Sequence, residues 1–412
     1  MTLHAVEPVT LDPLASDRHG EHRRLLAAGP LVRAVLPGDV ECWAVTRQDL
    51  AKELLTDPRF VKDLAQWGAW RRGEVPEGWA LLGAVASPRS MVTVDGADHR
   101  RLRSFTAAAF TKHRVEALRP RVTQIADTLL DALAGRQDED VDLKGAFAFP
   151  LPMSVIAELF GLAPDAADRL RGLYDSLFSS ITSPRETMAT LASLEEFYNG
   201  LIARKRAEPG DDLTSALIAA GEEGGGLSDL ELRGTLGVMV AAGHETTVNL
   251  LVSAVRALCL HPEQRALVRT GRAGWDTVVE ETLRWASPVN NFLFRYATED
   301  VHVAGRTIAE GEPVLMAYGA MGRDPGTHGP DADRFDLTRQ APRHLSFGHG
   351  PHMCPGSHLA RLEGGIALRR LFERFPDLDL TVPAAATEPY PSIVLHSYRT
   401  LPVRLGGRAG AA

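Results

Sequence analysis

The pattern of hydrophobic and polar residues divides the chain into a long helical middle and two shorter regions of strand-like alternation. The runs LVRAVLP and ECWAVT, at residues 31–37 and 41–46, predict two paired strands near the N-terminus. Helical periodicity then dominates to about Pro288, after which NFLFRYA, VHVAG and EPVLMAY predict strands again. The order predicts a mainly α fold with small β-sheets, to which both ends of the chain contribute a minor β region.

Two of the predicted helices have clear start signals. Ser183 and Ser228 are each followed three residues later by a glutamate, which is the pattern of a capping box. The helix that begins at Ser228 meets no proline until Pro262, so we expect it to span some thirty residues, or about 50 Å. A helix of that length crosses a whole domain. A final helix is predicted from Pro355 to about Phe375.

Composition narrows the class of protein. The 412 residues, 44% of them hydrophobic, contain no internal repeat or low-complexity linker, so we expect one domain spanning residues 1–412. A formal net charge of −8 predicts neither nucleic acid nor a membrane as a partner. The N-terminal segment lacks the apolar core of a signal peptide, which predicts a cytoplasmic protein. Cys42, Cys259 and Cys354 are too widely spaced for a disulfide framework or a zinc cage.

One of these cysteines stands in an unusual setting. The segment FGHGPHMCPG, from Phe347 to Gly356, places Cys354 among three glycines just before the final predicted helix. Pro355 suits the first helical position, which predicts Cys354 at the N-cap, where free backbone amides favour thiolate over thiol. The glycines let the backbone approach a large flat partner, so an iron–thiolate site fits. The alternatives are a buried structural cysteine and a dinucleotide motif, which is weak because Met353 stands where the third glycine belongs.

The spacing Phe347-x-x-Gly350-x-x-x-Cys354-x-Gly356 resembles the haem-binding signature of the cytochrome P450 family of haem-thiolate monooxygenases. The resemblance covers essentially the whole chain and is strongest to soluble bacterial, actinomycete-like members. It implies the cytochrome P450 fold, with a long central helix over the haem and a C-terminal helix beneath it. It also implies haem b as cofactor, Cys354 as the iron ligand, and Phe347, Gly348 and Gly356 beside the haem.

A polar segment interrupts the apolar sequence near the middle of the long predicted helix. In Ala242-Gly243-His244-Glu245-Thr246-Thr247, a glycine and a threonine pair disfavour a regular hydrogen-bond ladder, so we expect the helix to open locally and make room for a ligand. The segment is similar to the family's oxygen-activating motif. This similarity implies that Glu245 and Thr246 relay protons and that Ala242 lies against the haem. The alternative, a polar spot facing solvent, fits poorly with the apolar sequence on both sides.

Glu281 and Arg284 are spaced i, i+3 on one face of a predicted helix. Ion pairs with this spacing are common, and an exposed one contributes little to stability. The pair precedes Cys354 by about seventy residues, and at this position it is similar to the family's structural Glu-x-x-Arg pair. In the family this pair joins an arginine of the loop that precedes the cysteine. We expect Arg334 to be that arginine, with Arg339 as the alternative.

The resemblance also implies partners for the two haem propionates, which need neutralising groups when they are buried. His99 and Arg103 on a predicted helix, Arg295 in the strand NFLFRYA, and His352 two residues before the cysteine all match family propionate partners. Each of them alone is more typical of surface charge than of a propionate partner. Four at matching positions favour a haem site.

A further set of residues is expected, from its position relative to the family's motifs, to line a substrate pocket. The first three come from the segment 66–90, which is predicted to be a long irregular loop. The lining is mostly apolar with two amides, so we expect a bulky, largely uncharged substrate such as a steroid, terpenoid or polyketide. The expected lining residues are Leu81, Leu82, Val85, Phe178, Val238, Ala241, Asn290, Asn291, Phe292, Val394 and Leu395.

These motifs predict a monomeric monooxygenase that uses dioxygen to hydroxylate a small molecule in secondary metabolism. The sequence contains no flavin- or nicotinamide-binding unit, so electrons are expected from a ferredoxin and its ferredoxin reductase. The basic cluster of Arg100, Arg101, Lys112 and Arg343 is the expected docking site for such an acidic partner. Two alternatives remain open: a peroxide-driven haem-thiolate enzyme and a non-catalytic haem or small-molecule sensor. The acid–threonine pair favours the monooxygenase, because neither alternative needs relayed protons.

Overall fold

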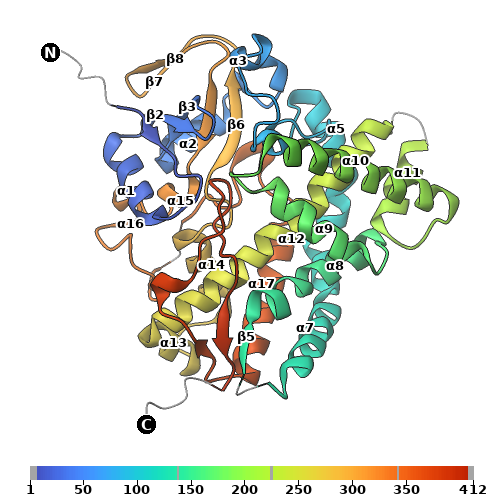
Figure 1. The fold of residues 1–412 in the computed structure, drawn as a ribbon, viewed down its shortest axis with the longest axis vertical. Helices are drawn as coiled ribbons and strands as arrows, with labels where there is room; N and C mark the ends of the chain where they lie inside the picture. The colour runs from blue at the N-terminus through green and yellow to red at the C-terminus, as the bar shows by residue number, and fades with distance from the viewer. Residues whose placement is uncertain (1–6, 137–138, 223–225, 341–342, 407–412) are drawn as a thin grey trace.

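The computed structural model describes residues 7–136, 139–222, 226–340 and 343–406. Helices make up most of it, and the largest sheet lies at one side of the helical body (Figure 1). The predicted mainly α fold with small β-sheets is therefore confirmed. The helices of eight or more residues are α1 (Arg18–Ala28), α2 (Gln48–Thr56), α5 (Gly96–Ala107), α7 (Arg119–Leu133), α8 (Pro150–Phe160), α9 (Ala166–Leu177), α10 (Pro184–Ala207), α11 (Leu213–Glu222), α12 (Asp229–Leu260), α13 (Pro262–Arg269), α14 (Trp275–Trp285) and α17 (Ser357–Arg374).

Shorter helical pieces connect these helices. The segment 66–90, predicted to be irregular, contains two helical turns, and the buried rings of Trp67 and Trp79 pack against Phe294. The short pieces are α3 (Gly68–Arg71), α4 (Leu82–Val85), α6 (Lys112–Ala117), α15 (Tyr318–Met321), α16 (Pro325–His328), the 3₁₀ turns η1 (Leu64–Gln66), η2 (Ala108–Phe110), η4 (Gly350–His352) and η5 (Ala384–Ala386), and the π-helical turn η3 (Lys144–Ala148).

The strands form three sheets. The largest has the order β1-β2-β3-β9-β6-β4, and its predicted hairpin is confirmed, because β2 and β3 pair antiparallel from Leu31–Val45 to Leu36–Val40. β9 pairs parallel with β3, which joins the C-terminal strand region to the N-terminal one. The strands are β1 (Val9–Thr10), β2 (Leu31–Leu36), β3 (Val40–Val45), β4 (Phe60–Val61), β6 (Phe292–Ala297) and β9 (Pro313–Met316), then β10 (Asp379–Leu380), β11 (Pro402–Arg404) and β5 (Asp140–Asp142) in the second sheet, and β7 (Val301–Val303) with β8 (Arg306–Ile308) in the third.

The two capping boxes predicted from the sequence are both present. The Ser183 hydroxyl accepts from the N–H of Glu186 at the start of α10, and the Ser228 hydroxyl accepts from the N–H of Glu231 at the start of α12. α12 is 32 residues long, in agreement with the predicted length. It is also long and apolar enough to cross a membrane, with a mean hydropathy of 1.3, but 78% of that window is buried inside the protein. α12 is therefore the central core helix.

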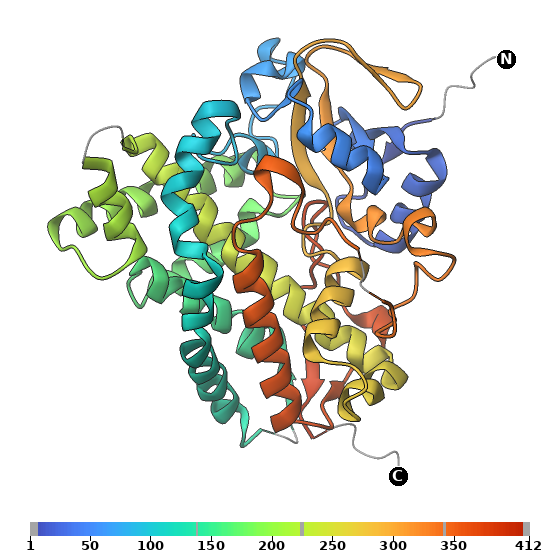
Figure 2. The same cartoon turned by 180° about the vertical axis from the view of Figure 1, so that it is seen from behind.

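The C-terminal helix starts later than predicted. Gly356 is the N-cap of α17, and Cys354 lies in the loop before it, so the prediction of Cys354 at the N-cap is wrong. Pro355 and Gly356 form a turn that delays the first helical residue to Ser357. α17 packs against α12 and α14, and it runs beside α7 on the other side (Figure 2). The cysteine loop is thus anchored to the centre of the core by the helix that follows it.

Candidate active site

The loop around Cys354 is shaped by two glycines in left-handed backbone conformations. Gly348 and Gly350 both have φ of 72°, and a Cβ on Gly350 would lie 2.9 Å from the Thr56 side chain. The N–H of Cys354 donates to the carbonyl of Phe347 at 2.8 Å, which closes the loop and leaves the sulfur half-buried. Burial raises the pKa of the Cys354 thiol, so the protein alone favours the thiol form, and a cation bound to the sulfur would be needed to favour the thiolate.

α12 has one accessible stripe in the middle of a buried helix. Val238, Ala242 and Thr246 lie at i, i+4 and i+8 and remain accessible, whereas Ala241 and Glu245 beside them are buried. This stripe is the part of the helix that a flat ligand can reach. The predicted acid, Glu245, belongs to the neighbouring buried face.

The predicted local opening of α12 is not observed. The helix is continuous from Asp229 to Leu260, because the Thr246 hydroxyl donates to the carbonyl of Ala242 at 2.5 Å and the Thr247 hydroxyl donates to that of Gly243 at 3.2 Å. These side-chain bonds to the residue four positions earlier satisfy the hydroxyl groups without breaking the ladder.

Glu245 is held beside its neighbour His244. The imidazole Nδ1 lies 3.2 Å from the Glu245 Oε1, and Nε2 lies 3.2 Å from the carbonyl oxygen of Phe149, which follows η3. The rings of His244 and Phe149 also contact each other edge to face, with centroids 4.3 Å apart. The carboxylate of the predicted proton relay therefore lies next to a fully buried imidazole, whose Nδ1 makes no hydrogen bond among the described residues.

Glu281 and Arg284 form a buried bidentate ion pair, with N···O distances of 2.7 and 2.6 Å. Arg284 also donates to the carbonyls of Gly322 and Ala332, so its guanidinium ties α14 to the loop before the cysteine. Glu281 and Arg284 are therefore buried and bonded to each other, as a structural ion pair requires.

The arginine that joins this pair is Arg339, and the prediction of Arg334 is wrong. The Arg339 Nε lies 3.4 Å from Glu281 Oε1, and its side chain is only 15% exposed. The Arg334 side chain is 75% exposed, and the residue contributes only its backbone carbonyl, which accepts from Arg284 at 2.7 Å. The turn that bonds the Arg334 N–H to the Asp331 carbonyl places the backbone against the pair.

The four expected propionate partners come together near the cysteine loop. The rings of His99 and His352 have centroids 4.1 Å apart, and Arg103 donates to the carbonyl of Met353 at 2.6 Å. His352 Nε2 lies 2.9 Å from Asp95, and Arg295 lies 3.7 Å from the same carboxylate. Three chain segments remote in sequence thus place cationic or imidazole groups at one location.

Two residues of this cluster were not predicted from the sequence, Asp95 and Lys62. Lys62 donates from Nζ to the carbonyls of Leu293 and Phe294, at 3.1 and 2.6 Å, and burial lowers its pKa to about 7. Although burial alone would raise the pKa of Asp95, hydrogen bonds from His352 and from the Lys62 N–H hold it below its usual value. Neither residue belongs to a recognisable motif, so only the fold reveals them.

The residues present fit a haem. His99 Nε2 is buried without a hydrogen-bond partner among the described residues, which leaves a ring nitrogen available to an anionic group. Asp95 is the carboxylate of this cluster and contacts Arg295, whereas Arg103 and the Lys62 ammonium donate to backbone carbonyls, so the cluster has cationic groups to spare for a dianion. A half-buried sulfur, an accessible stripe on α12 and this cluster suit a flat macrocycle with two carboxylates.

The expected pocket residues divide into two groups. Leu81, Val85, Val394 and Leu395 belong to one apolar cluster, against which Leu82 and Phe178 pack, while Val238 and Ala241 lie on α12 and Phe292 is 38% exposed. The two amides do not line a pocket. Asn290 lies 2.7 Å from His22, and Asn291 donates to the carbonyl of Ile393 at 2.7 Å, so both side chains are buried within the protein.

The amide prediction is wrong because these side chains satisfy buried backbone and imidazole groups. Leu81 and Leu395 are likewise almost fully buried in the core. The part of the expected lining that stays accessible is apolar.

Similarity to known proteins identifies the family. A model of the family described as Cytochrome P450 matches residues 275–398. The 2-hydroxy-5-methyl-1-naphthoate 7-hydroxylase of Streptomyces carzinostaticus is 42% identical, over 98% of this chain and 99% of that protein. The chain belongs to the cytochrome P450 family. The vitamin D(3) 25-hydroxylase of Pseudonocardia autotrophica is 37% identical, over 95% of this chain and 94% of that protein.

Solved P450 structures resemble this one over nearly the whole chain. The testosterone-bound CYP154C4 from Streptomyces sp. ATCC 11861 has a TM-score of 0.95 and 48% sequence identity, covering 98% of this chain and 100% of that chain. This P450 is accordingly a haem-thiolate monooxygenase with the cytochrome P450 fold. Enzymes of this family use a haem, dioxygen, a redox partner and a small-molecule substrate.

Proposed function

We propose that this P450 hydroxylates a bulky, largely apolar small molecule of the steroid, terpenoid or polyketide class. The observation that carries the proposal is that the accessible residues of the expected lining are apolar, whereas both predicted amides are buried and bonded within the protein. An apolar lining of this kind favours substrates held by shape and apolar contact. The related vitamin D(3) 25-hydroxylase and the testosterone-bound CYP154C4 support the same substrate class.

The cofactor of this proposal is haem b. When bound, it activates dioxygen for insertion of one oxygen atom into a C–H bond. Cys354 would hold the iron, and Phe347, Gly348 and Gly356 would border the macrocycle on the cysteine side, with Ala242 on the other. His99, Arg103, Arg295 and His352 would neutralise the propionates, with Lys62 as a further cation.

Thr246 and Glu245 would control protons at this site. The Thr246 hydroxyl donates its proton to the Ala242 carbonyl, so its oxygen can still accept a hydrogen bond from a group bound at the accessible stripe. Glu245, which lies beside His244, would supply the protons that Thr246 positions.

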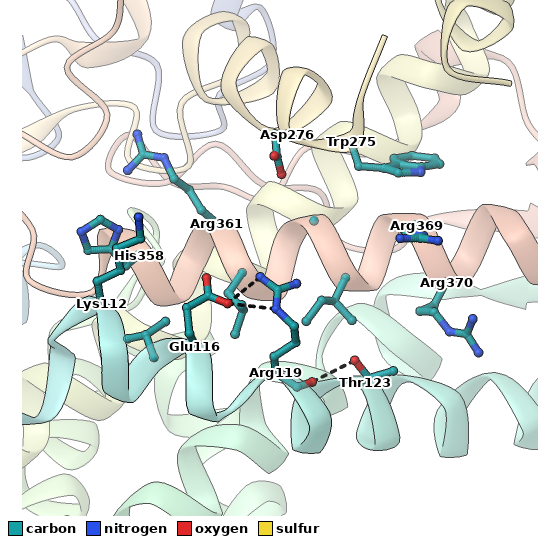
Figure 3. Close-up of a pocket in the computed structure, with 14 residues that line it drawn as sticks. Lys112, Glu116, Arg119, Thr123, Trp275, Asp276, His358, Arg361, Arg369 and Arg370 are labelled. Carbon is teal, nitrogen blue, oxygen red and sulfur yellow. Dashed lines mark hydrogen bonds and ion pairs between the residues drawn. The ribbon is translucent and has the colours of Figure 1, made fainter. Parts of the chain in front are cut away.

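We further propose that electrons come from a ferredoxin and its ferredoxin reductase. A groove of about 820 Å³ separates α17 from α6 and α7, and side chains from both sides reach into it (Figure 3). Lys112, Arg119, Arg361, Arg369 and Arg370 give it a basic lining, which suits an acidic partner.

The groove also lies beside the cysteine loop, because Arg361 stacks on the Phe347 ring at 4.5 Å. Of the cluster expected from the sequence, Lys112 lines this groove, whereas Arg101 is engaged by Glu231 at the start of α12. Four of the groove's basic residues also pair with acids, namely Arg119, Arg361, Arg369 and Arg370, so the groove is proposed as a docking site beside the predicted cluster and not in place of it.

The proposal also includes a cytoplasmic, monomeric protein in which residues 1–412 form one domain. A peroxide-driven haem-thiolate enzyme and a haem sensor are the competing functions. Product formation with NADPH, ferredoxin and ferredoxin reductase, compared with product formation from hydrogen peroxide alone, separates them. We expect product only with the electron-transfer system. Efficient turnover with peroxide alone would contradict the proposal, and so would the absence of product from every substrate that binds.

Substrate binding is tested by titrating steroids, terpenoids and polyketides into the haem-loaded protein. We expect a low- to high-spin absorbance shift with members of these classes and none with small charged compounds. The reverse preference would contradict the proposed pocket.

A further inference from the structure

Two arginines from distant helices contact one buried tyrosine ring. Arg18 of α1 and Arg256 of α12 place their guanidinium carbons 6.0 and 4.7 Å from the centre of the Tyr398 ring. Arg18 is 6% exposed, Tyr398 is 9% exposed and Arg256 is half-buried, so the contact lies inside the protein. The function proposed above gives these three residues no role.

Backbone carbonyls satisfy each guanidinium only in part. Arg18 Nη2 donates to the carbonyl of Tyr390 at 2.8 Å and to that of Leu395 at 3.5 Å. Arg256 Nη2 donates to the carbonyl of Ala384 at 3.0 Å. The Nε groups of both arginines are buried without a hydrogen-bond partner in the part of the chain that the structure describes. Two N–H donors of permanently charged groups are therefore unsatisfied at one location.

The acidic groups nearby do not balance the two guanidiniums. Neither arginine makes an ion pair with a carboxylate of the described residues. Burial lowers the pKa of Arg18, and the charge of Arg256 lowers it further. The acidic groups that act against this change are Tyr398, Glu21 and Asp12. Burial raises the pKa of Glu21 to about 7, so this acid is only about half ionised at neutral pH. The two positive charges therefore exceed the acidic charge that faces them.

An arginine side chain has few ways to relieve such an arrangement. Unlike a buried lysine, it does not lose its proton at neutral pH, so the two charges persist. The face of the Tyr398 ring attracts both guanidiniums, which offsets part of their repulsion. A water molecule can accept from an Nε–H group, but it leaves the repulsion in place. An anion accepts the same hydrogen bonds and also cancels the excess charge.

We propose that Arg18 and Arg256 together bind one small inorganic anion of halide size beside the Tyr398 ring, each donating to it from Nε. Because Arg18 and Tyr398 are buried, a bulky organic anion is excluded. Arg18 also holds the carbonyls of Tyr390 and Leu395, so the bound anion fixes the segment between them against α1 and α12. Leu395 belongs to the apolar cluster of the expected substrate lining. The anion site is independent of the reaction proposed above, because it concerns the folded protein alone.

Binding in solution is tested by urea unfolding of the haem-loaded protein in sodium chloride and in sodium gluconate at the same ionic strength. Chloride has the size that the proposed site requires, whereas gluconate is too large. An anion that binds only the folded protein lowers the equilibrium constant for unfolding about 100-fold when its concentration is about 100 times its dissociation constant. We therefore expect this constant to fall with chloride concentration, relative to its value in gluconate.

Arg18→Met and Arg256→Met should each abolish the difference between the two salts. Both variants lose hydrogen bonds to carbonyls and should be less stable in either salt, so the readout is the difference between salts and not the stability itself. Arg24→Met, at an exposed arginine of α1, is the matched control and should keep the difference. Equal stability of the parent in chloride and gluconate would overturn the proposal, and so would a difference that persists unchanged in either variant. Arg256→Met, at the half-buried position, provides the test should Arg18→Met fail to fold.

The position of the anion is tested by anomalous diffraction from crystals of the haem-loaded protein soaked in sodium bromide. We expect a bromide peak within hydrogen-bonding distance of the Nε groups of Arg18 and Arg256. An ordered water molecule in its place would refute the proposal. A bromide peak without the chloride effect in solution would mark an adventitious ion only, and this result would refute it as well.

Discussion

Glu363, on the face of α17 that packs against α12 and α14, offers a quantitative test of how this core is built. The residue is 1% exposed, and neither carboxyl oxygen has a well-aligned hydrogen-bond partner in the described residues. α17 packs closely here, since a Cβ on Gly364 would lie 3.1 Å from Leu250 and 3.2 Å from Val279. Burial raises the pKa of Glu363 to about 8, and a hydrogen bond with Thr247 offsets only part of this effect. The folded protein therefore keeps this carboxyl group protonated at neutral pH.

The sign and size of the pH dependence follow from this pKa. Between pH 4.5 and about 8 the folded state holds a proton on Glu363 that the unfolded state has released, so the free energy of unfolding falls as pH rises through this window. The full effect is about 5 kcal/mol, at 1.36 kcal/mol for each pH unit between the two pKa values. Glu363→Gln cannot ionise, so it should equal the parent near pH 4.5 and become more stable by up to that amount above pH 8.

The assay is urea unfolding of the haem-loaded parent and Glu363→Gln proteins between pH 5 and 9. The cofactor contribution cancels in the difference, because both proteins carry the haem. Glu196→Gln, at an exposed position of α10, is the control and should differ from the parent by a constant amount. A constant difference for Glu363→Gln as well would refute the reasoning, because it would mean that the folded protein hydrates or pairs this carboxylate.

The other predictions concern the iron ligand, the proton relay and the buried ion pair. Cys354→Ser should abolish the red-shifted Soret band of the reduced, carbon-monoxide-bound protein, whereas Cys42→Ser and Cys259→Ser should keep it; a normal band in Cys354→Ser would exclude this residue as the ligand. Thr246→Ala should continue to consume NADPH while product falls and hydrogen peroxide rises, and Glu245→Gln should slow the whole cycle; parental product per NADPH in Thr246→Ala would argue against its role. Glu281→Ala should lose about 3–5 kcal/mol of stability, because it strands Arg284, and Arg339→Ala about 1.5–3 kcal/mol. Arg334→Ala should change stability in urea by less than about 0.5 kcal/mol, and an effect as large as that of Arg339→Ala would contradict the observed geometry.

Local signals in the sequence were sufficient for the long elements. The capping boxes at Ser183 and Ser228 and the absence of proline up to Pro262 predicted α10 and α12, because these signals act within one helical turn or along one helix. The paired strands β2 and β3 were predictable for the same reason. β5 was not, since three residues reading Asp-Val-Asp carry too little alternation to stand out.

Side-chain directions in irregular segments could not be predicted. Arg334 and Arg339 lie in one loop without secondary structure, and spacing does not determine which of them turns inward. The amides of Asn290 and Asn291 are occupied by His22 and by the Ile393 carbonyl, which are remote in sequence. Asp95 and Lys62 join the expected cluster only through the fold. Pro355 was compatible with a helix start and with the turn that precedes one.

The internal hydrogen bonds of the Asn290 and Asn291 amides have a consequence for substrate selectivity. A pocket that recognises a hydroxyl or amino group rejects analogues lacking it by about four orders of magnitude or more, whereas an apolar pocket discriminates a single methylene only about 10- to 200-fold. Because both amides are already bonded within the protein, they cannot recognise a substrate hydroxyl or amino group at the proposed site. Under the proposed function we expect this P450 to oxidise a range of related scaffolds, and a new hydrogen-bonding group on the α12 stripe, for example at Val238, to narrow that range.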